Sequence, residues 1–446
     1  MPVQTETDRV DAFQVVVWVA LLLYAWRLQD LVSVLGSLNI FPVVSAAVLV
    51  LFLLDRDPRR GQRRWRDRTV TLALLLAAWG LASLATSIYP SRGLRFLVLD
   101  HGRTLVVMLI VMASIRSIGD VRKLMWVHIA GAATTALLGL LMFRSSSSGR
   151  MMIAYYYDPN DVAMLLACAA PVVFTVFRRG MPLWARIAGV VTVLLMAATI
   201  VGTESRGGFL ALVAVGIFAL VRQRSIRPSV RWFGTALLVA CISFAATGGF
   251  WERMQTMLHP TEDYNWVGQA RTGRLEVWRR GVGYMIGNPV FGTGLNTFAI
   301  AEGTMPEAVA LQEQGIGIKW SAPHNSFVQI GAELGVPALL IYLALIGYTM
   351  RSMWRLSRSG GGRSADGGAA AGSDIAEAVL GALCAYCVGG FFLTQAYSKF
   401  LYLGLFPIAV GLSTLRGGSV HDAIVRLPAH VRRRQARVTF ADNPPR

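Results

Sequence analysis

The apolar residues of this 446-residue chain are gathered into blocks of about 17–22 residues, separated by short arginine-rich stretches. A helix needs about 20 mostly apolar residues to cross the hydrocarbon core of a bilayer. Only 15% of the residues are charged, against about 25% in a typical soluble domain, and the mean hydropathy is +0.50. The sequence therefore predicts an all-α polytopic membrane protein and argues against a soluble enzyme.

Twelve apolar blocks predict twelve transmembrane helices, with boundaries good to a few residues. They lie at about residues 12–28, 38–54, 69–88, 95–115, 124–143, 160–177, 187–203, 207–221, 233–250, 326–350, 376–395 and 399–415. The start of the chain, MPVQTETDRVD, has no basic stretch and no cleavage site of small residues. The first block is therefore expected to be a retained anchor and not a signal peptide.

The basic residues alternate between the two sides of this predicted topology. One side holds 29 of the 43 Lys and Arg residues, in 55–68, 116–123, 178–186, 222–231, 351–375, the tail from Arg416, and Arg9. Positive charge is retained on the cytoplasmic side, so both termini are expected in the cytoplasm. The net charge of +18 is thus explained by membrane topology. No groove-sized basic face is apparent, and no nucleic-acid partner is predicted.

The topology divides the chain into four parts. A long loop is expected outside the cytoplasm between spans nine and ten, and its Trp, Tyr and Pro residues and a helical stretch indicate that it is folded. Loops of this length tend to be functional. The parts are spans one to nine in 1–250, the partly helical loop 251–325, spans ten to twelve in 326–415 with a flexible Gly/Ala/Ser-rich cytoplasmic linker at 359–374, and the basic cytoplasmic tail 416–446.

Arg206 lies in the short outer turn Thr203–Gly208 between spans seven and eight. Lys and Arg are disfavoured in short outer loops, so this arginine requires a reason. It could anchor a helix end by reaching toward water. The adjacent Gly207 and Gly208 favour a functional role, because glycine lets a backbone or ligand approach closely.

The long loop contains four arginines within ten residues, namely Arg271, Arg274, Arg279 and Arg280. They could form a solvated face, or a cationic clamp for a phosphate-bearing ligand. Trp278 follows Arg274 at i+4 and would lie beside it on a helix. We expect that helix to begin with Thr272 as N-cap, to end at Gly287–Pro289, and to place an apolar stripe on the bundle or the membrane surface, formed by Leu275, Trp278, Val282 and Met285.

His324 lies in Pro323-His324-Asn325-Ser326, where the long loop enters span ten. The positive potential at the start of a helix disfavours imidazolium and would keep His324 able to accept a proton near neutral pH. A structural role for a lone histidine is the alternative. Glu333, lower in the same helix, is a carboxylate inside a predicted span, and such groups usually face a polar cavity or a partner.

A fourth element, Tyr155 to Asp161, lies at the outer start of span six. Asp158 and Asp161 have the spacing of a metal-binding pair, but two carboxylates alone are a weak signal, and no metal is predicted. Asx residues beside a proline also commonly form turns and helix caps. The tyrosines suit a membrane interface or stacking on a sugar.

The ordered set of motifs resembles the superfamily of O-antigen ligases and polymerases, which are bacterial envelope glycosyltransferases. The resemblance is specific over about residues 150–350 and departs at Ala338, where the family usually has a second glycine. It is carried by Asp158-Pro159-Asn160-Asp161, Ser205-Arg206-Gly207-Gly208, the run from Gly273-Arg274 through Trp278 to Asn288-Pro289, Gly292-Thr293-Gly294, Pro323-His324-Asn325-Ser326 and Glu333-Leu334-Gly335-Val336-Pro337.

The resemblance implies a GT-C-like, inverting and metal-independent transferase without a cofactor, on the periplasmic face of the bacterial inner membrane. The donor would be a glycan linked through diphosphate to a polyprenyl lipid, and the acceptor a hydroxyl of lipid A–core or another glycan. By similarity, Arg206 and Arg274 would hold the diphosphate, and His324 would act as, or support, the general base for the acceptor hydroxyl. Further substrate contacts are expected from Arg271, Arg279, Arg280, Trp278, Asn325, Asp158, Asn160 and Asp161.

Other functions remain open at this level. A ligase, a polymerase and a protein O-oligosaccharyltransferase would share this donor and differ only in the acceptor. A twelve-span transporter is a remote alternative, because such proteins usually show two similar halves. The motifs above do not recur in the other half of the sequence. A structural scaffold for envelope assembly is the remaining alternative.

Overall fold

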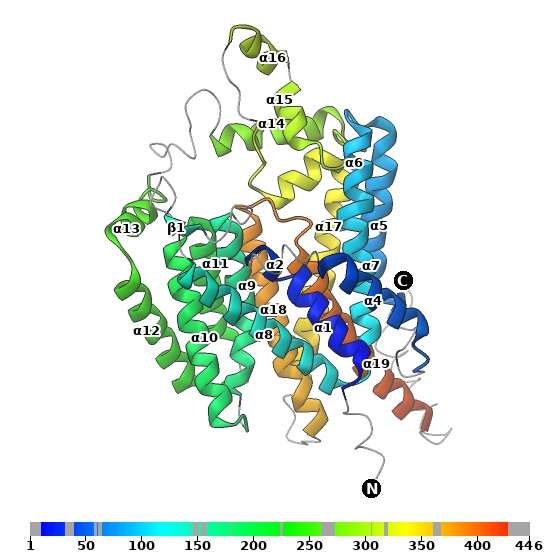
Figure 1. The fold of residues 1–446 in the computed structure, drawn as a ribbon, viewed down its shortest axis with the longest axis vertical. Coiled ribbons are helices and arrows are strands. Elements are labelled where there is room, and N and C mark those ends of the chain that lie inside the picture. The colour runs from blue at the N-terminus through cyan, green and yellow to red at the C-terminus, as the bar shows by residue number, and fades with distance from the viewer. Residues whose placement is uncertain are drawn as a thin grey trace, which may run out of the picture.

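The structure is a computed structural model that describes residues 10–31, 40–57, 60, 65–142, 144–145, 151–152, 158–178, 180–223, 226–259, 273–304, 306–315, 320–359 and 367–426. These residues form a bundle of helices (Figure 1). Among them, the strands are confined to one antiparallel pair of two residues each, β1 (Arg144–Ser145) and β2 (Met151–Met152).

The first half of the bundle comprises α1 (Ala12–Tyr24), α2 (Leu28–Leu31), α4 (Ile40–Leu54), α5 (Arg68–Ala82), η2 (Ser83–Thr86), α6 (Pro90–Phe96), η3 (Leu97–His101), α7 (Gly102–Ser114), α8 (Ile118–Leu141), α9 (Pro159–Val173), η4 (Phe174–Phe177) and α10 (Leu183–Gly202). The second half comprises α11 (Arg206–Arg222), α12 (Pro228–Ala245), α13 (Gly248–Gln255), α14 (Arg274–Gly287), α15 (Phe298–Thr304), α16 (Pro306–Glu313), α17 (Ser326–Arg358), α18 (Gly367–Gly390), η5 (Leu401–Leu405) and α19 (Phe406–Arg426).

A helix lies at each of the twelve predicted spans. Eight helices of the described chain are long and apolar enough to cross a membrane, counting α5–η2, α6–η3–α7, α8, α9–η4, α10, α12, α17 and the part of α18 from Gly372. Three further predicted spans hold shorter apolar helices, at Ala12–Tyr24, Pro42–Leu54 and Leu401–Arg416. The remaining span is occupied by α11, which has 17 residues. The all-helical, multi-pass class is confirmed, and the count of twelve spans stays a prediction.

The helices begin where the sequence provides a cap. The side chains of Asp67, Ser117, Asp158 and Ser205 accept hydrogen bonds from backbone N–H groups in the first turns of α5, α8, α9 and α11. These N–H groups have no partner within their own helix, so each cap stabilises the helix start by about 1 kcal/mol.

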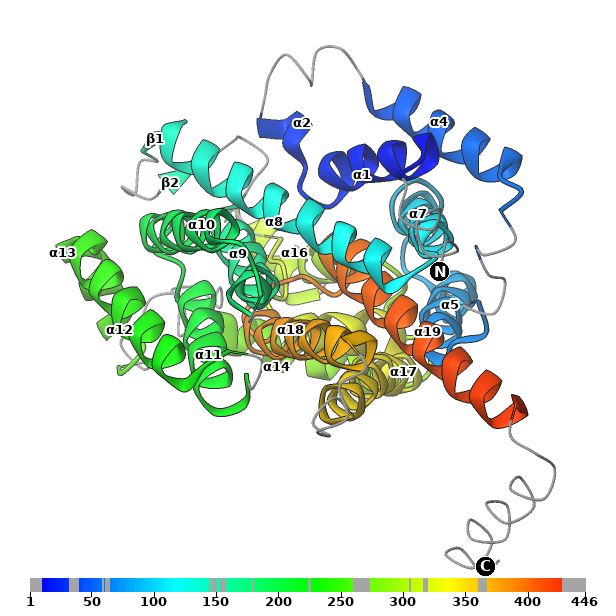
Figure 2. The same ribbon diagram turned by 90° about the horizontal axis from the view of Figure 1, so that it is seen from below.

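Helix α18 is central to the bundle. Seen from below, it is surrounded by α9, α11, α17 and α19, and it packs on each of them (Figure 2). Glycines permit this close packing: a Cβ on Gly381 would lie 2.8 Å from the Phe218 ring, and one on Gly389 would lie 2.8 Å from Met164. Membrane helices associate through such small residues, because lipid tails supply no hydrophobic driving force between them.

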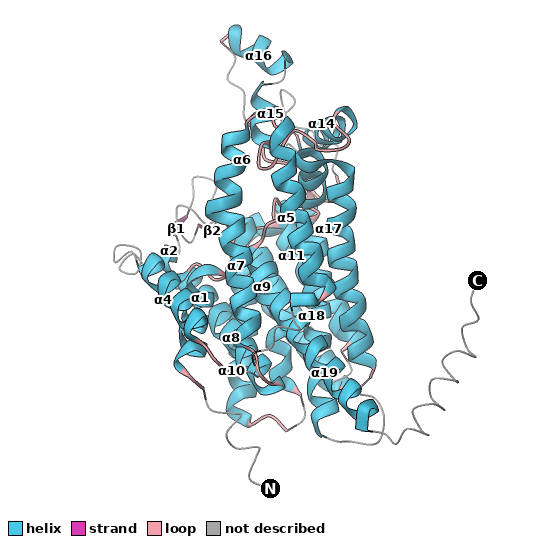
Figure 3. Ribbon diagram, turned by 90° about the vertical axis from the view of Figure 1, so that its right-hand side faces the viewer, coloured by secondary structure: helices cyan, strands magenta, loops and turns pink. Residues whose placement is uncertain are grey.

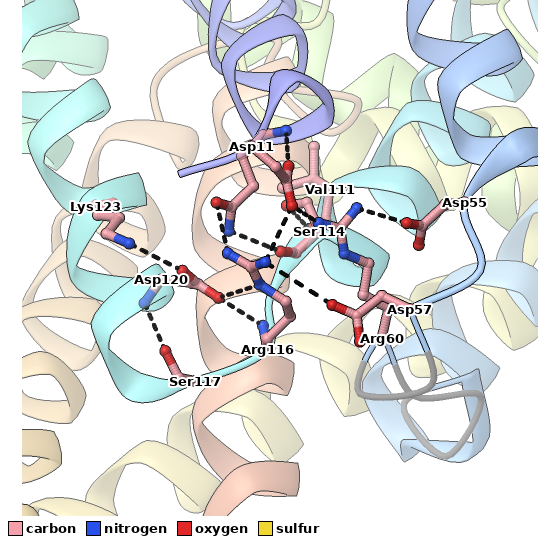
Figure 4. Close-up of polar contacts among 11 residues, drawn as sticks. Asp11, Asp55, Asp57, Arg60, Val111, Ser114, Arg116, Ser117, Asp120 and Lys123 are labelled. Atoms are coloured by element: carbon pink, nitrogen blue, oxygen red, sulfur yellow. Dashed lines mark hydrogen bonds and ion pairs between the residues drawn. The ribbon is translucent and has the colours of Figure 1, made fainter. Parts of the chain in front are cut away.

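The two ends of the bundle differ. Helices α14, α15 and α16 rise above α5 and α17 at one end, which we call the loop end (Figure 3). At the opposite end, Arg116 ties α1 to α8 by contacting Asp11 at 3.0 Å and Asp120 at 3.2 Å (Figure 4). Arg60 joins the same network through Asp11 and, at 3.1 Å, Asp55. The predicted cytoplasmic segments 55–68 and 116–123 therefore meet at this end.

The structure has a helix in the second half of the segment 359–374, which was predicted to be a flexible linker. Helix α18 begins at Gly367, so residues 367–374 are helical, and residues 360–366 lie outside the described residues. The alanines Ala369–Ala371 favour this helix, because alanine has the highest helix propensity of all residue types. Asp374 and Ile375 are buried, so packing adds to that propensity.

Candidate functional site

Arg206 is the first residue of α11 and is buried at the loop end. Ser205 caps this helix, since its hydroxyl accepts a 3.1 Å hydrogen bond from the Gly208 N–H. The Arg206 guanidinium donates a 2.7 Å hydrogen bond to the Thr256 hydroxyl, just after α13. Arg206 is therefore a positioned cation, packed between the turn that precedes α11 and the end of α13.

The two glycines after Arg206 serve helix packing. A Cβ on Gly208 would lie 2.3 Å from the Cβ of Ala163 in α9. A Cβ on Gly207 would lie 3.1 Å from the Cβ of Phe392, in the connecting segment 391–399 between α18 and η5. The absence of side chains thus brings the start of α11 against both α9 and the connecting segment.

Helix α14 begins at Arg274, with Gly273 at the N-cap position. The predicted cap, Thr272, lies with Arg271 outside the described residues, so the helix starts one residue later than that cap implied. The predicted end is confirmed: Gly287 is the last helical residue and Asn288 is the C-cap.

The predicted apolar stripe of α14 is divided between packed and exposed residues, since Met285 lies against Gly331 of α17 and the Trp278 ring packs on Phe391. Val277 and Gly281 are buried, whereas Leu275 and Val282 are 48% and 39% exposed. Gly281 decides the orientation, because a Cβ there would lie 2.5 Å from Val328 of α17. Close backbone approach at Gly281 therefore adds a packed face that the predicted stripe did not include.

The arginines of α14 have different environments. Arg274 is partly buried in the first turn, and Arg279 is exposed. Arg280 makes a bidentate pair with the buried Glu302 of α15, with N–O distances of 2.9 and 2.5 Å. Hydrogen bonding to Glu302 raises the pKa of Arg280. In the structure Arg280 therefore holds α15 against α14, a role that is distinct from the predicted substrate contact.

His324 precedes the first turn of α17 and has a left-handed backbone, with φ of 44°. Its N–H donates a 2.9 Å hydrogen bond to the Thr394 hydroxyl in the connecting segment. The carbonyl of Pro323 accepts a 2.8 Å hydrogen bond from the Trp278 indole N–H. A non-glycine residue with positive φ persists only where its surroundings hold it, and such residues cluster at functional sites.

Asn325 and Ser326 fix the helix start beneath His324. The Asn325 side-chain oxygen accepts hydrogen bonds from the N–H groups of Phe327 and Val328, so Asn325 is the N-cap. The Ser326 hydroxyl donates to the Leu393 carbonyl at 2.8 Å and accepts from the Gln395 N–H at 2.9 Å. The histidine backbone is thus tied on both sides.

Helix α17 is broken at Gly335, where φ is 80°. The carbonyls of Ala332 and Glu333 accept hydrogen bonds from the N–H groups of Thr293 and Gly294, at 2.9 and 2.8 Å. The Glu333 carboxylate also accepts from the Asn296 N–H at 3.1 Å. The Gly292–Gly294 motif therefore docks on the break in α17, and Glu333 has a backbone partner in the loop, as a buried carboxylate requires.

Asp158 and Asn160 belong to the start of α9. The Asp158 carboxylate accepts a 2.7 Å hydrogen bond from the Asn160 N–H, as a helix cap does. Of the two predicted readings of Asp158, the structure thus supports capping. No group of three or more His, Cys, Asp or Glu side chains that could hold a metal occurs among the described residues.

Asp161 lines a cavity of about 270 Å³ that opens between α9, the connecting segment and residue Arg27. Its polar lining also includes Gln395, Ser398 and Lys399, the last paired with Asp100 at 3.3 Å. Acidic, basic and amide groups line the same space. Such a mixed lining suits a ligand rich in hydroxyl groups more than a bare anion.

The connecting segment links the predicted residues. Phe392 lies against the glycine after Arg206, Phe391 packs on the Trp278 ring at 5.2 Å between centroids, and Thr394 holds the His324 N–H. Gln395, the next residue, lines the cavity. The start of α11, the start of α14, the histidine loop and the cavity are therefore arranged around one short segment at the loop end.

Comparison with known families matches residues 191–343 to the family model described as O-antigen ligase. This part of the chain is an O-antigen ligase family domain. The domain includes Arg206, Arg274, His324 and Glu333, and it excludes Asp158–Asp161 and the connecting segment. No curated protein matches the chain. The resemblance to the O-antigen ligase and polymerase superfamily, expected from the motifs, is confirmed over residues 191–343, and it supports an enzymatic role.

The sequence interpretation missed the connecting segment, Arg27 and Lys399. A signal for the two cations was present: both lie in or beside predicted outer loops, where basic residues require a reason as Arg206 does. Gln395 and Thr394 carried no comparable signal, because single polar residues near a helix start are common.

Proposed function

We propose that this O-antigen ligase family protein transfers a glycan from a polyprenyl-diphosphate carrier to an acceptor hydroxyl, with lipid A–core as the acceptor. The reaction would take place at the loop end, on the periplasmic face of the bacterial inner membrane. One observation carries the proposal: the start of α11 beside Arg206 and the backbone of His324 both contact residues 392–394 of the connecting segment.

The chemistry follows from the residue types. The acceptor oxygen attacks the sugar C1, its proton passes to His324, and the C1–oxygen bond to the diphosphate breaks with inversion. The diphosphate leaves with the electron pair, and the guanidinium groups of Arg206 and Arg274 would stabilise its charge. An imidazole has an ordinary pKa near neutrality, which suits a general base. Since the arginines supply positive charge, the proposal requires no metal ion.

The cavity beside Asp161 supports a binding site for the sugar part of a substrate. Carboxylate, amide and hydroxyl groups there can accept and donate hydrogen bonds to sugar hydroxyls. We assign Asp161 to this contact, with Asp158 and Asn160 shaping the helix start that carries it. Arg271, Arg279 and Trp278 are proposed to border the donor, and Asn325 to support His324.

The test is transfer by the purified protein, using a polyprenyl-diphosphate-linked glycan and lipid A–core. His324→Ala and Arg274→Ala are expected to lower the rate by at least about 100-fold. Arg95→Ala is the matched control, since Arg95 is an exposed arginine of α6 at the same end. Equal activity of wild type and both site variants would contradict the proposal.

Cells that lack the gene distinguish the acceptors. Long glycan chains left on the polyprenyl carrier, with bare core on lipid A, support a ligase. Single repeat units in place of chains would identify a polymerase. Loss of glycan from protein alone would identify a protein O-oligosaccharyltransferase.

A further inference from the structure

A second pocket, which two arginines and an aspartate help to line, lies at the end of the bundle opposite the proposed transferase site. It is formed where α8, η4 and α18 meet, and its lining includes Arg122, Arg178 and Asp374. Its volume of about 50 Å³ is small. A cavity needs at least about 10–15 Å³ by this measure to hold one water-sized group, so the pocket can hold a small polar group.

Two guanidinium groups face one carboxylate in this pocket. Arg178 lies 3.4 Å and Arg122 3.8 Å from the same Asp374 oxygen, distances longer than the 2.7–2.9 Å of a tight charge-assisted hydrogen bond. Glu377, one turn further along α18, is buried and is not part of the lining. The lining thus holds two guanidinium groups and one carboxylate, and its arginines are partly exposed.

The position of the pocket relates it to the membrane surface. Trp126, which lines it, stacks on Trp184 of α10 with centroids 5.7 Å apart, and Trp184 is 64% exposed. Leu183 and Ile187 are exposed beside it. Exposed tryptophan with adjacent apolar side chains is typical of the interface where lipid phosphates lie.

We propose that this pocket binds the phosphate of an anionic phospholipid, in the leaflet at the end opposite the transferase site. Guanidinium binds phosphate oxygens in bidentate fashion, and basic pockets between transmembrane helices bind lipid head groups. The acyl chains would lie along the exposed apolar residues of α10. This inference is independent of the proposed transferase function, because it uses none of its residues.

The experiment is native mass spectrometry and thermal unfolding of the full-length protein with phosphatidylglycerol, phosphatidylcholine or inorganic phosphate. Phosphatidylglycerol is expected to be retained and to raise the melting temperature, and the other two are not. Arg122→Ala and Arg178→Ala should each weaken retention by about tenfold. Arg186→Ala is the matched control, an exposed arginine of α10 outside the pocket.

Asp374→Asn separates lipid binding from a purely structural ion pair. Removing the competing carboxylate is expected to strengthen phosphatidylglycerol retention, whereas a structural pair predicts loss of stability with no gain in retention. The proposal is overturned if inorganic phosphate or phosphatidylcholine protects equally, or if Arg186→Ala weakens retention as much as Arg122→Ala. If Arg122→Ala and Arg178→Ala do not fold, Asp374→Asn and the comparison of the three ligands on the wild-type protein decide the question.

Discussion

The indole N–H of Trp278 in α14 donates a 2.8 Å hydrogen bond to the carbonyl of Pro323, the residue directly before His324. The loop that carries the proposed base is therefore held at two points, by Trp278 of α14 at the Pro323 carbonyl and by Thr394 at the His324 N–H. Because α14 begins with Arg274, the same short helix positions both the proposed base and a proposed diphosphate ligand.

Trp278→Phe tests this relationship. The substitution keeps a ring that can pack on Phe391 and removes the donor to Pro323. Loss of one hydrogen bond that leaves a partly buried carbonyl unpaired costs about 1–2 kcal/mol, so we expect transfer to fall by about tenfold at normal protein levels. Leu275→Ala, on the exposed face of α14, is the control. Unchanged transfer in Trp278→Phe would show that this hydrogen bond does not position His324.

We predict that no other residue can replace Gly335, because of its backbone conformation and the close approach of another backbone segment. Its φ of 80° is strained for any other residue, and an added Cβ would lie 2.4 Å from the Val290 carbonyl oxygen. Gly335→Ala is expected to abolish stable insertion, measured by protein level in the membrane and by melting temperature. Gly347→Ala, in the same helix with open space around it, should be tolerated. A stable Gly335→Ala protein would contradict the account of the broken helix.

The sequence predicted well what depends on long patterns. Apolar blocks located a helix at every expected span, because the hydrophobic length of a bilayer imposes a long, repeated signal. Local chemistry also predicted the end of α14 at Gly287 and the Asx cap at Asp158. The grouping of Arg206, Arg274 and His324 stays a prediction from the family motifs.

What the sequence could not predict depends on contacts between distant segments. The orientation of α14 follows from Gly281 meeting Val328, and no periodicity within α14 encodes that choice. The pairing of Arg280 with Glu302 likewise required the position of α15. The connecting segment, which contacts Gly207, Trp278 and His324, lies outside the motifs altogether.

The pair Arg280–Glu302 is predicted to stabilise the fold more than it serves transfer. Breaking a buried ion pair by removing one partner costs about 3 kcal/mol, so Arg280→Ala and Glu302→Ala should each lower the melting temperature. The double variant should lose less than the sum of the two, because neither charge is then left without a partner. Additive losses in this cycle would mean that the pair does not act as a unit.

Tyr284 gives the same cluster a pH dependence. Its hydroxyl donates to Glu302 at 2.9 Å, and burial, with the Glu302 charge, raises the tyrosine pKa above its ordinary value of 10. A group with a raised folded-state pKa contributes its full stability below the unfolded pKa and loses it as pH rises through the folded pKa. The melting-temperature difference between wild type and Tyr284→Phe should therefore be constant below about pH 10 and shrink above it. A difference that changes between pH 6 and 8 would assign the titration to another group.

Asp158 and Asp161 are predicted to respond differently to the same change. Asp158 accepts a backbone hydrogen bond as a cap, and asparagine caps as well as aspartate, so Asp158→Asn should keep both stability and transfer. Asp161 faces the cavity, so Asp161→Asn should keep the fold and weaken the binding of a sugar substrate, seen as a raised KM. Asp158→Ala, which removes the cap, should cost about 1 kcal/mol of stability.

The same pair of variants tests whether the two carboxylates hold a metal ion. Metal ligation would make Asp158→Asn and Asp161→Asn equally inactive and would make wild-type transfer sensitive to EDTA, with magnesium restoring it. The capping geometry at Asp158 predicts neither result, since the Asn160 N–H already occupies a carboxylate oxygen at 2.7 Å. We expect transfer to survive EDTA, because Arg206 and Arg274 would supply the charge that a metal otherwise gives to a diphosphate leaving group.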